Sequence, residues 1–209
     1  MKGLFSYDNP VMQWMLKLLR LAWLNILTLL LCVPIITVGA AMTASHEAVK
    51  KLKSEEGNAT QNLFSAFGKN FAKATLIWLL FLAAAAFFIS SNYICTQVDL
   101  LSMQVAQIVL IVEAAVMCVV LIWIFPLLVR YENKVLHTIK NAFTMTIAFL
   151  PSTLLMLAVY LLPLFLFILV PAAFPVVAFF GITAPIYCNL NLYQKIFDKV
   201  DAMQAQKET

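Results

Sequence analysis

The sequence predicts an all-α fold, a polytopic transmembrane helical bundle that forms one domain over residues 1–209, and three observations support this. Of the 209 residues, 63% are hydrophobic and only 11% are charged, whereas a soluble domain carries about 25% charged residues. Long uncharged runs recur, and residues 141–194 contain no Asp, Glu, Lys, Arg or His. The Lys and Arg residues gather in short segments between these runs. The lipid bilayer is therefore the solvent that suits this chain.

The first membrane segment is expected over residues 14–34, and a broken stretch ends it. Residues 24–41 read LNILTLLLCVPIITVGAA, an apolar helix with one amide, Asn25, that runs into Pro34. Proline removes a backbone N–H and disfavours a continuing helix. We expect the chain to turn near Pro34.

A second membrane segment is expected to return over residues 37–53. It begins with Thr37 and Gly39, and small side chains follow, which allow helices to approach closely. The segment is about 24 Å long as a helix, and His46 would lie deep within it. It is therefore expected to be a partial or re-entrant helix packed between its neighbours.

An interfacial helix is predicted over residues 60–72, followed by a span over residues 74–95. Apolar side chains recur at helical spacing beside polar ones in the first of these segments, which is typical of a helix lying in the membrane surface. These side chains are Leu63, Phe64, Phe67 and Phe71. The second segment carries no charge until its end.

The rest of the chain is expected to form three further spans. Residues 105–129 form the first of them and contain one carboxylate, Glu113. The uncharged run that follows would be about 80 Å long as a single helix, far more than the hydrocarbon core of about 30 Å. Prolines crowd its midpoint, so we divide it into segments over residues 143–169 and 174–194.

The distribution of positive charge favours six membrane segments with both termini in the cytoplasm. All 14 Lys and Arg residues lie in residues 1–20, 50–73, 130–140 and 195–207. The connectors 96–104 and 169–175 carry none, as the positive-inside rule predicts for external loops. The expected location is a bacterial cytoplasmic membrane. The alternative has five spans and places Lys2, Lys17 and Arg20 outside.

A polar layer inside the bundle is the one candidate site. Counted from the outer helix ends, Glu113 lies at a depth similar to Asn25, His46 and Tyr160. A charge near the bilayer centre costs at least about 2.5–3.5 kcal/mol, so such a group is expected to face the bundle and to have partners. The layer would either fix the helices by hydrogen bonds or form a proton- or solute-linked site.

The sequence lacks the motifs that are typical of enzymes. The sequence contains no phosphate-binding glycine loop, no HExxH and no GxSxG, and its four cysteines lie in separate apolar segments. No nucleophile–base pair supports an intramembrane enzyme. We expect no enzymatic activity, no cofactor or metal, and no nucleic-acid partner.

Three stretches resemble the YesL family, bacterial membrane proteins named for unknown function. They are GLFSYDNP at residues 3–10, the pattern formed by Asn25, Leu27, Pro34, Thr37, Gly39 and Ala40, and LFSAFGKNFAKATLIW at residues 63–78. Family members occur mostly in Gram-positive bacteria, often beside genes for carbohydrate ABC importers and polysaccharide-degrading enzymes. The resemblance therefore implies a role in sugar uptake.

Two functions remain open from the sequence. The first is a non-catalytic auxiliary subunit that packs against the permease pair of a carbohydrate ABC importer, with the lipid bilayer around both. The alternative is a small stand-alone transporter or channel with a polar layer around Glu113. Against the alternative, the sequence shows no inverted repeat of the kind that many transporters carry.

Overall fold

The computed structural model describes residues 10–96 and 101–206, and these residues are helical with no strand among them. The first half contains α1 (Pro10–Cys32), the 3₁₀ turn η1 (Ile35–Thr37), α2 (Val38–Lys53) and α3 (Ala59–Thr96). The second half contains α4 (Leu101–Arg130), α5 (Val135–Ala148), α6 (Leu150–Leu169), η2 (Pro171–Ala173), α7 (Phe174–Phe180) and α8 (Thr183–Ala205). The stretch at residues 3–9, the connector 97–100, Lys2 and Lys207 lie outside the described residues.

Four described helices are long and apolar enough to cross a membrane. They cover Val11–Cys32, Ala59–Cys95, Gln104–Arg130 and Leu150–Leu169. Together, α7 and α8 would make a fifth, bent by 57° at a short break. The all-α membrane bundle is thereby confirmed, with four or five spans by length and composition. The expected returning segment, α2, has only 16 residues and falls below this criterion.

The chain turns at Pro34, between α1 and α2. Pro34 has an extended backbone, and the Thr37 hydroxyl donates hydrogen bonds to the carbonyls of Pro34 at 2.8 Å and Leu31 at 2.6 Å. The bond to Leu31 satisfies a carbonyl group that the end of α1 leaves without a helical partner. The side chain of Thr37 therefore closes the turn that proline opens.

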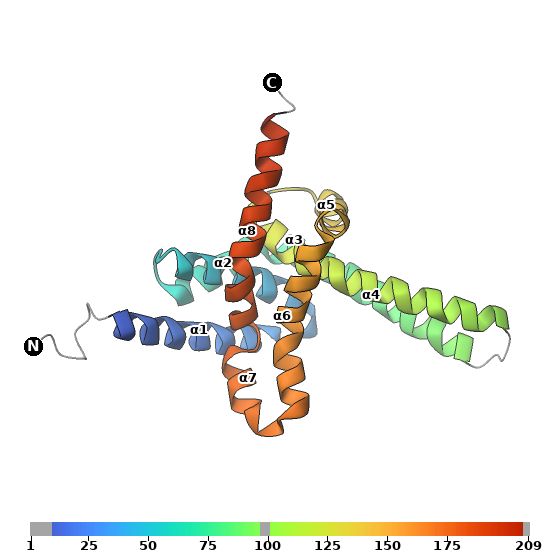
Figure 1. Ribbon diagram of the computed structural model, residues 1–209, viewed down its shortest axis with the longest axis horizontal. Coiled ribbons are helices and arrows are strands. Elements are labelled where there is room, and N and C mark those ends of the chain that lie inside the picture. The colour runs from blue at the N-terminus through green and yellow to red at the C-terminus, as the bar shows by residue number, and fades with distance from the viewer. Residues whose placement is uncertain (1–9, 97–100, 207–209) are drawn as a thin grey trace, which may run out of the picture.

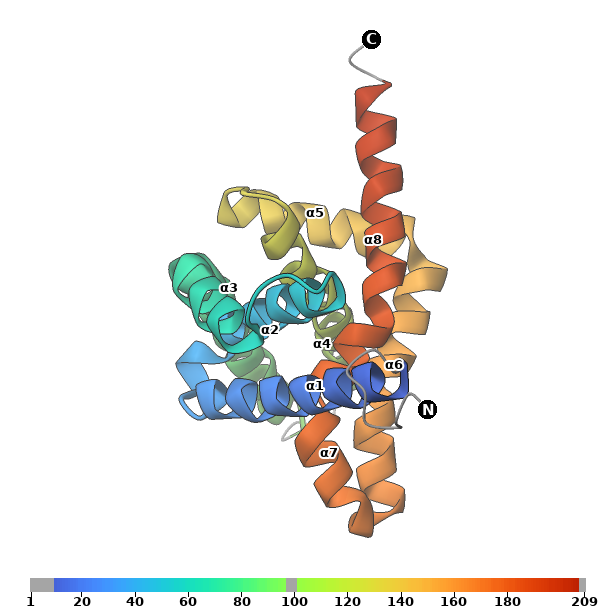
Figure 2. The same cartoon turned by 90° about the vertical axis from the view of Figure 1, so that its left-hand side faces the viewer.

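After the turn, α2 runs back along α1. Its last residues lie beside the first half of α1, because Lys17 forms an ion pair with Glu55 at 3.3 Å. Trp23 donates a hydrogen bond to Thr60 at 2.9 Å, just past the same loop. In Figure 2, α2 lies directly above α1, with α3 and α8 on either side. The N-terminal part of the chain is thus a helical hairpin.

The returning helix α2 is the centre of the packing. Ten of its 16 residues are buried. A side chain at Gly39 would lie 2.5 Å from Trp78 Cβ and 2.6 Å from the Ala74 carbonyl oxygen, so only glycine allows this approach of α2 to α3. Trp78 then donates a hydrogen bond to the Ile35 carbonyl at 2.7 Å. Small side chains on α2 thus bring backbones close together, as in other membrane bundles.

One long helix replaces an expected boundary. The predicted interfacial helix and the span after it form one continuous helix, α3, of 38 residues, about 57 Å at 1.5 Å per residue. The hairpin that α3 forms with α4 extends away from the rest of the molecule (Figure 1). Its outer half has side chains that are mostly exposed on the protein surface.

Prolines divide the second half of the chain. The expected segment 143–169 is two helices, which Phe149 separates with a non-helical backbone. Pro151 favours this break, because it has no N–H to bond the Ile147 carbonyl and its ring would clash with that carbonyl in a continuous helix. A tight turn at Pro171–Ala173 joins α6 to α7, close to where the sequence predicted a hairpin. A second break near Gly181 separates α7 from α8. The last helix, α8, continues without interruption past residue 194, where the last predicted span ends.

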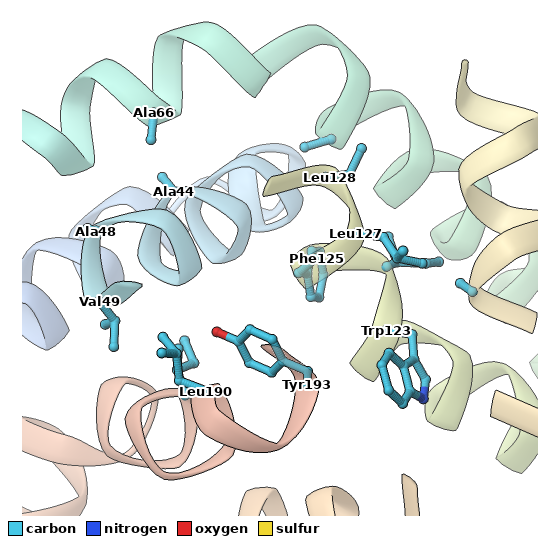
Figure 3. Packing of buried hydrophobic residues seen from close by; sticks show 14 of the residues in the cluster. Ala44, Ala48, Val49, Ala66, Trp123, Phe125, Leu127, Leu128, Leu190 and Tyr193 are labelled. Carbon is cyan, nitrogen blue, oxygen red and sulfur yellow. The ribbon is translucent and has the colours of Figure 1, made fainter. Parts of the chain in front are cut away.

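The core lies where α2, α4 and α8 meet. Figure 3 shows Val49 of α2 facing Leu190 and Tyr193 of α8, with Phe125 and Trp123 of α4 beside them. The indole of Trp123 is fully buried, and its N–H donates to the Thr153 hydroxyl at 3.0 Å. Burying a large aromatic group together with a satisfied polar atom is favourable in an apolar interior.

Candidate functional site

Asn25 lies at the break between α7 and α8. Its amide oxygen accepts hydrogen bonds from the backbone N–H groups of Ile182 at 2.8 Å and Thr183 at 3.0 Å, at the start of α8. Its amide nitrogen donates to the Ala178 carbonyl at 2.7 Å, near the end of α7. The side chain is fully buried. One amide therefore satisfies free backbone groups on both sides of a broken helix.

A second contact reinforces this attachment of α1 to the break. The Thr183 hydroxyl donates to the Leu21 carbonyl at 3.0 Å. Leu21 precedes Asn25 by one helical turn, so two successive turns of α1 hold the start of α8. In transporters with discontinuous helices, free helix ends of this kind bind substrates and ions. Here the side chain of Asn25 occupies that position.

His46 lies at the middle of α2, in an aromatic environment. Its ring is 2% exposed, stacks on Phe125 with ring centres 6.2 Å apart and lies 5.9 Å from the ring of Tyr193. The Tyr160 hydroxyl lies 3.4 Å from His46 Nε2. Rings from α4, α6 and α8 therefore enclose the imidazole.

Two polar atoms near the centre of α2 have no hydrogen-bond partner among the described residues: Ser45 Oγ and His46 Nδ1. A cavity of about 10 Å³ lies beside His46 and is also lined by Lys50, Arg130 and Gln194. Space of this size holds about one water molecule. The polar centre therefore has room for water and none for a sugar.

The structure brings together only part of the predicted polar layer. His46 and Tyr160 meet, whereas the polar atoms of Asn25 bind the break between α7 and α8. Pro34, Thr37 and Gly39 form the turn and the close helix contact described above.

Glu113 does not join this layer. It lies exposed on α4, and no hydrogen bond or ion pair involves it within the described part of the chain. The expectation that it faces the bundle and finds partners there is not met, because α4 extends beyond the elements that cover its inner half. Glu113 instead lines an open hollow of about 580 Å³ with Lys140 of α5 and apolar side chains of α3 and α4.

A charged cluster joins the ends of α4 and α8, and the sequence reasoning did not predict it. Arg130 binds Asp198 at 3.0 Å and Asp201 at 2.7 Å. The Tyr131 hydroxyl donates to the other oxygen of Asp201 at 2.5 Å. The two aspartates are three residues apart and so share one face of α8, which was the only sequence signal for the cluster.

The cluster lies past the apolar part of α8. The hydrogen bonds within it shift the pKa values of Asp201 and Tyr131. Donation from Tyr131, and then from Arg130, lowers the pKa of Asp201 below its usual range. Partial burial, and then the bond to Asp201, raises the pKa of Tyr131 to about 12. Because the folded pKa of Asp201 is lowered, its contribution to stability is present above the unfolded pKa of about 3.9 and is lost as the pH falls through the folded pKa.

Metal-binding groups are not gathered in the described residues, where no three His, Cys, Asp or Glu side chains could hold one ion. The four cysteines are free. The polar groups that do cluster, around Asn25, His46 and Arg130, mainly join one helix to another.

The comparison with protein families matches residues 21–93 to a family described as "Protein of unknown function, DUF624". The match covers less than half of the chain. It extends from the second half of α1 through α2 to near the end of α3, so it includes Asn25, the turn at Pro34 and the Gly39 contact. The chain is similar to this family over the helical hairpin and the helix packed against it. No curated protein and no solved structure matches the chain.

Proposed function

We propose that this protein is a non-catalytic membrane subunit that packs against another membrane protein. The observation that carries the proposal is the α3–α4 hairpin, which extends away from the rest of the molecule (Figure 1) and leaves most of its outer half uncovered. The buried polar groups support the same proposal, because the amide of Asn25 is engaged in bonds between helices.

The partner we propose is the permease pair of a carbohydrate ABC importer. The support is the resemblance to the YesL family, carried by Asn25, Pro34, Thr37 and Gly39, which here form the α1–α2 hairpin and its attachments. The matched family is described as of unknown function, so it supplies no partner of its own.

Co-purification tests this proposal directly. The tagged chain is expressed with the permease subunits of a carbohydrate importer from the same genome, and the complex is isolated in a mild detergent. The control uses an importer permease pair for an unrelated class of substrate. We expect stoichiometric recovery of the carbohydrate permeases alone. A monodisperse chain without permease in both preparations would contradict the proposal.

The proposed topology places both termini in the cytoplasm of a bacterial cell, with six membrane segments and α2 as the short returning one. Single cysteines at Lys2 and Glu132, in a variant without the four native cysteines, report on it. Neither should react with a membrane-impermeant reagent added outside intact cells. External labelling at Lys2 alone would support five spans.

A stand-alone transporter is the second candidate, and the broken helix formed by α7 and α8 favours it. Transporters often bind solutes at such breaks. Two observations oppose it. The amide of Asn25 already binds the free backbone groups at the helix ends, and the cavity beside His46 is the size of one water molecule. Flux through proteoliposomes that contain this chain alone would establish transport, and absence of flux for sugars and ions is expected.

A further inference from the structure

We propose that the groove between the outer halves of α3 and α4 binds a transmembrane helix of another membrane protein, and that Glu113 pairs there with a basic or amide side chain of that helix. The inference rests on the proposed function, which requires a membrane partner, and it identifies the contact surface and the chemistry of the partner.

The helical period places Glu113 on the face of α4 that is buried elsewhere. Residues 113, 117, 120 and 124 recur at spacings of four, three and four, so they share one face. Val120 and Ile124 are buried in the core. Glu113 therefore continues a packing face outward, past the level at which the other helices of the chain bury it.

The groove has two walls and one closed end. Phe81 and Phe88, seven residues apart on α3, form one wall, and Glu113 and Val116 of α4 form the other. Side chains of α5 close the end, with Leu136 79% exposed. Two antiparallel helices with a hollow of about 580 Å³ between them suit a third helix, as in other helix-in-groove contacts.

The depth of Glu113 indicates that something polar must cover it. It lies nine residues from one end of the Gln104–Arg130 segment, about 14 Å, and seventeen from the other, about 26 Å. A carboxylate at such a depth is expected to face protein or water and to be paired. Within the described residues it has no hydrogen bond or ion pair. Lys140 lines the same groove without pairing with it, and the apolar side chains of Val112 and Val116 lie beside it.

The charge of Glu113 indicates which kind of molecule binds in the groove. A lipid tail offers no donor to a carboxylate. A second copy placed symmetrically would bring an identical carboxylate to the same position, and like charges disfavour each other. A helix with Lys, Arg, His, Asn or Gln at this depth satisfies Glu113, and its apolar side chains cover the aromatic wall.

Site-specific photo-crosslinking in native membranes tests the proposal. A photoreactive residue replaces Val112 or Val116, which line the groove beside Glu113, or Phe165 on the exposed surface of α6 as a control. We expect one defined adduct from the two groove positions and none from Phe165. Mass spectrometry should place the crosslink in a membrane span of the partner that carries a basic or amide side chain.

Two substitutions link the adduct to Glu113. Its yield should fall at least about tenfold in Glu113→Leu and should be largely retained in Glu113→Gln, because the amide still forms a hydrogen bond. Equal yields in the wild type and Glu113→Leu would overturn the proposal, as would a crosslink only to lipid or to a second copy. Circular dichroism of each purified variant checks that it folds.

The outcomes separate this inference from the proposed function. A Glu113-dependent adduct with a protein other than an importer permease supports the groove and contradicts the importer assignment. Co-purification with permeases without any Glu113-dependent adduct supports the importer assignment and overturns the groove.

Discussion

Replacing Asn25 by alanine should loosen the attachment of α1 to the break between α7 and α8. The substitution removes three hydrogen bonds to backbone groups at once, to the Ala178 carbonyl and to the N–H groups of Ile182 and Thr183. All three backbone groups lie at helix ends, where the helices themselves supply no replacement partner. The change should therefore act on the angle between α7 and α8 as well as on stability.

The magnitude follows from the environment of the amide. Interhelical hydrogen bonds in membrane proteins average about 0.6 kcal/mol each, which gives a lower bound near 2 kcal/mol for three. A buried group left without a partner costs about 1–3 kcal/mol, and Asn25 is fully buried. We expect Asn25→Ala to lower the free energy of unfolding by about 2–4 kcal/mol.

Unfolding in mixed micelles measures this loss, and Thr28→Val is the matched control. Thr28 is also fully buried on α1, but its hydroxyl bonds only within its own helix, to the Leu24 carbonyl at 2.7 Å. We expect the control to lose less than about 1 kcal/mol. Spin labels at Val176 and Met203 should show a broader distance distribution in Asn25→Ala alone. Equal losses of unfolding free energy in both variants, with unchanged distances, would refute the proposal that Asn25 holds α1 against the break between α7 and α8.

Two further substitutions test the packing and the charged cluster. Gly39→Ala should cost about 1–3 kcal/mol of unfolding free energy, because the added Cβ would lie 2.5 Å from Trp78 Cβ; Gly68→Ala, with no atom within 4 Å of its added Cβ, should cost nothing or stabilise α3 slightly. Asp201→Asn should reduce stability by no more than about 1 kcal/mol at pH 7, because the pair with Arg130 is partly exposed to solvent. The difference from the wild type should shrink as the pH falls below about 4, and a difference that persists at pH 2–3 would contradict the assigned role of the carboxylate.

Some site residues could be singled out from the sequence, but their partners could not. Asn25 was conspicuous as an amide in an apolar helix, and Pro34 was conspicuous as a helix breaker. The atoms that Asn25 binds lie 153 to 158 residues further along the chain. No local pattern reports such a contact, since it depends on where α1 meets the break between α7 and α8.

Glu113 shows the opposite case. The rule that charges within spans face the bundle predicted partners for Glu113, which shares a helical face with the buried Val120 and Ile124. It could not show that this face is uncovered at the level of Glu113, because coverage depends on the lengths and directions of neighbouring helices. The Arg130 cluster was missed for a similar reason, since Asp198 and Asp201 lie 68 and 71 residues after Arg130 in the sequence.

Composition and the placement of charge were sufficient to predict an all-α membrane protein and a turn near Pro34. Partition between water and lipid depends on the chemistry of each side chain, and a missing backbone N–H is a property of proline itself. The number of helices that cross, the burial of α2 and the surroundings of Asn25, His46 and Glu113 required the tertiary structure. These features arise from contacts between helices distant in sequence, and the energy of such a contact depends on both partners at once.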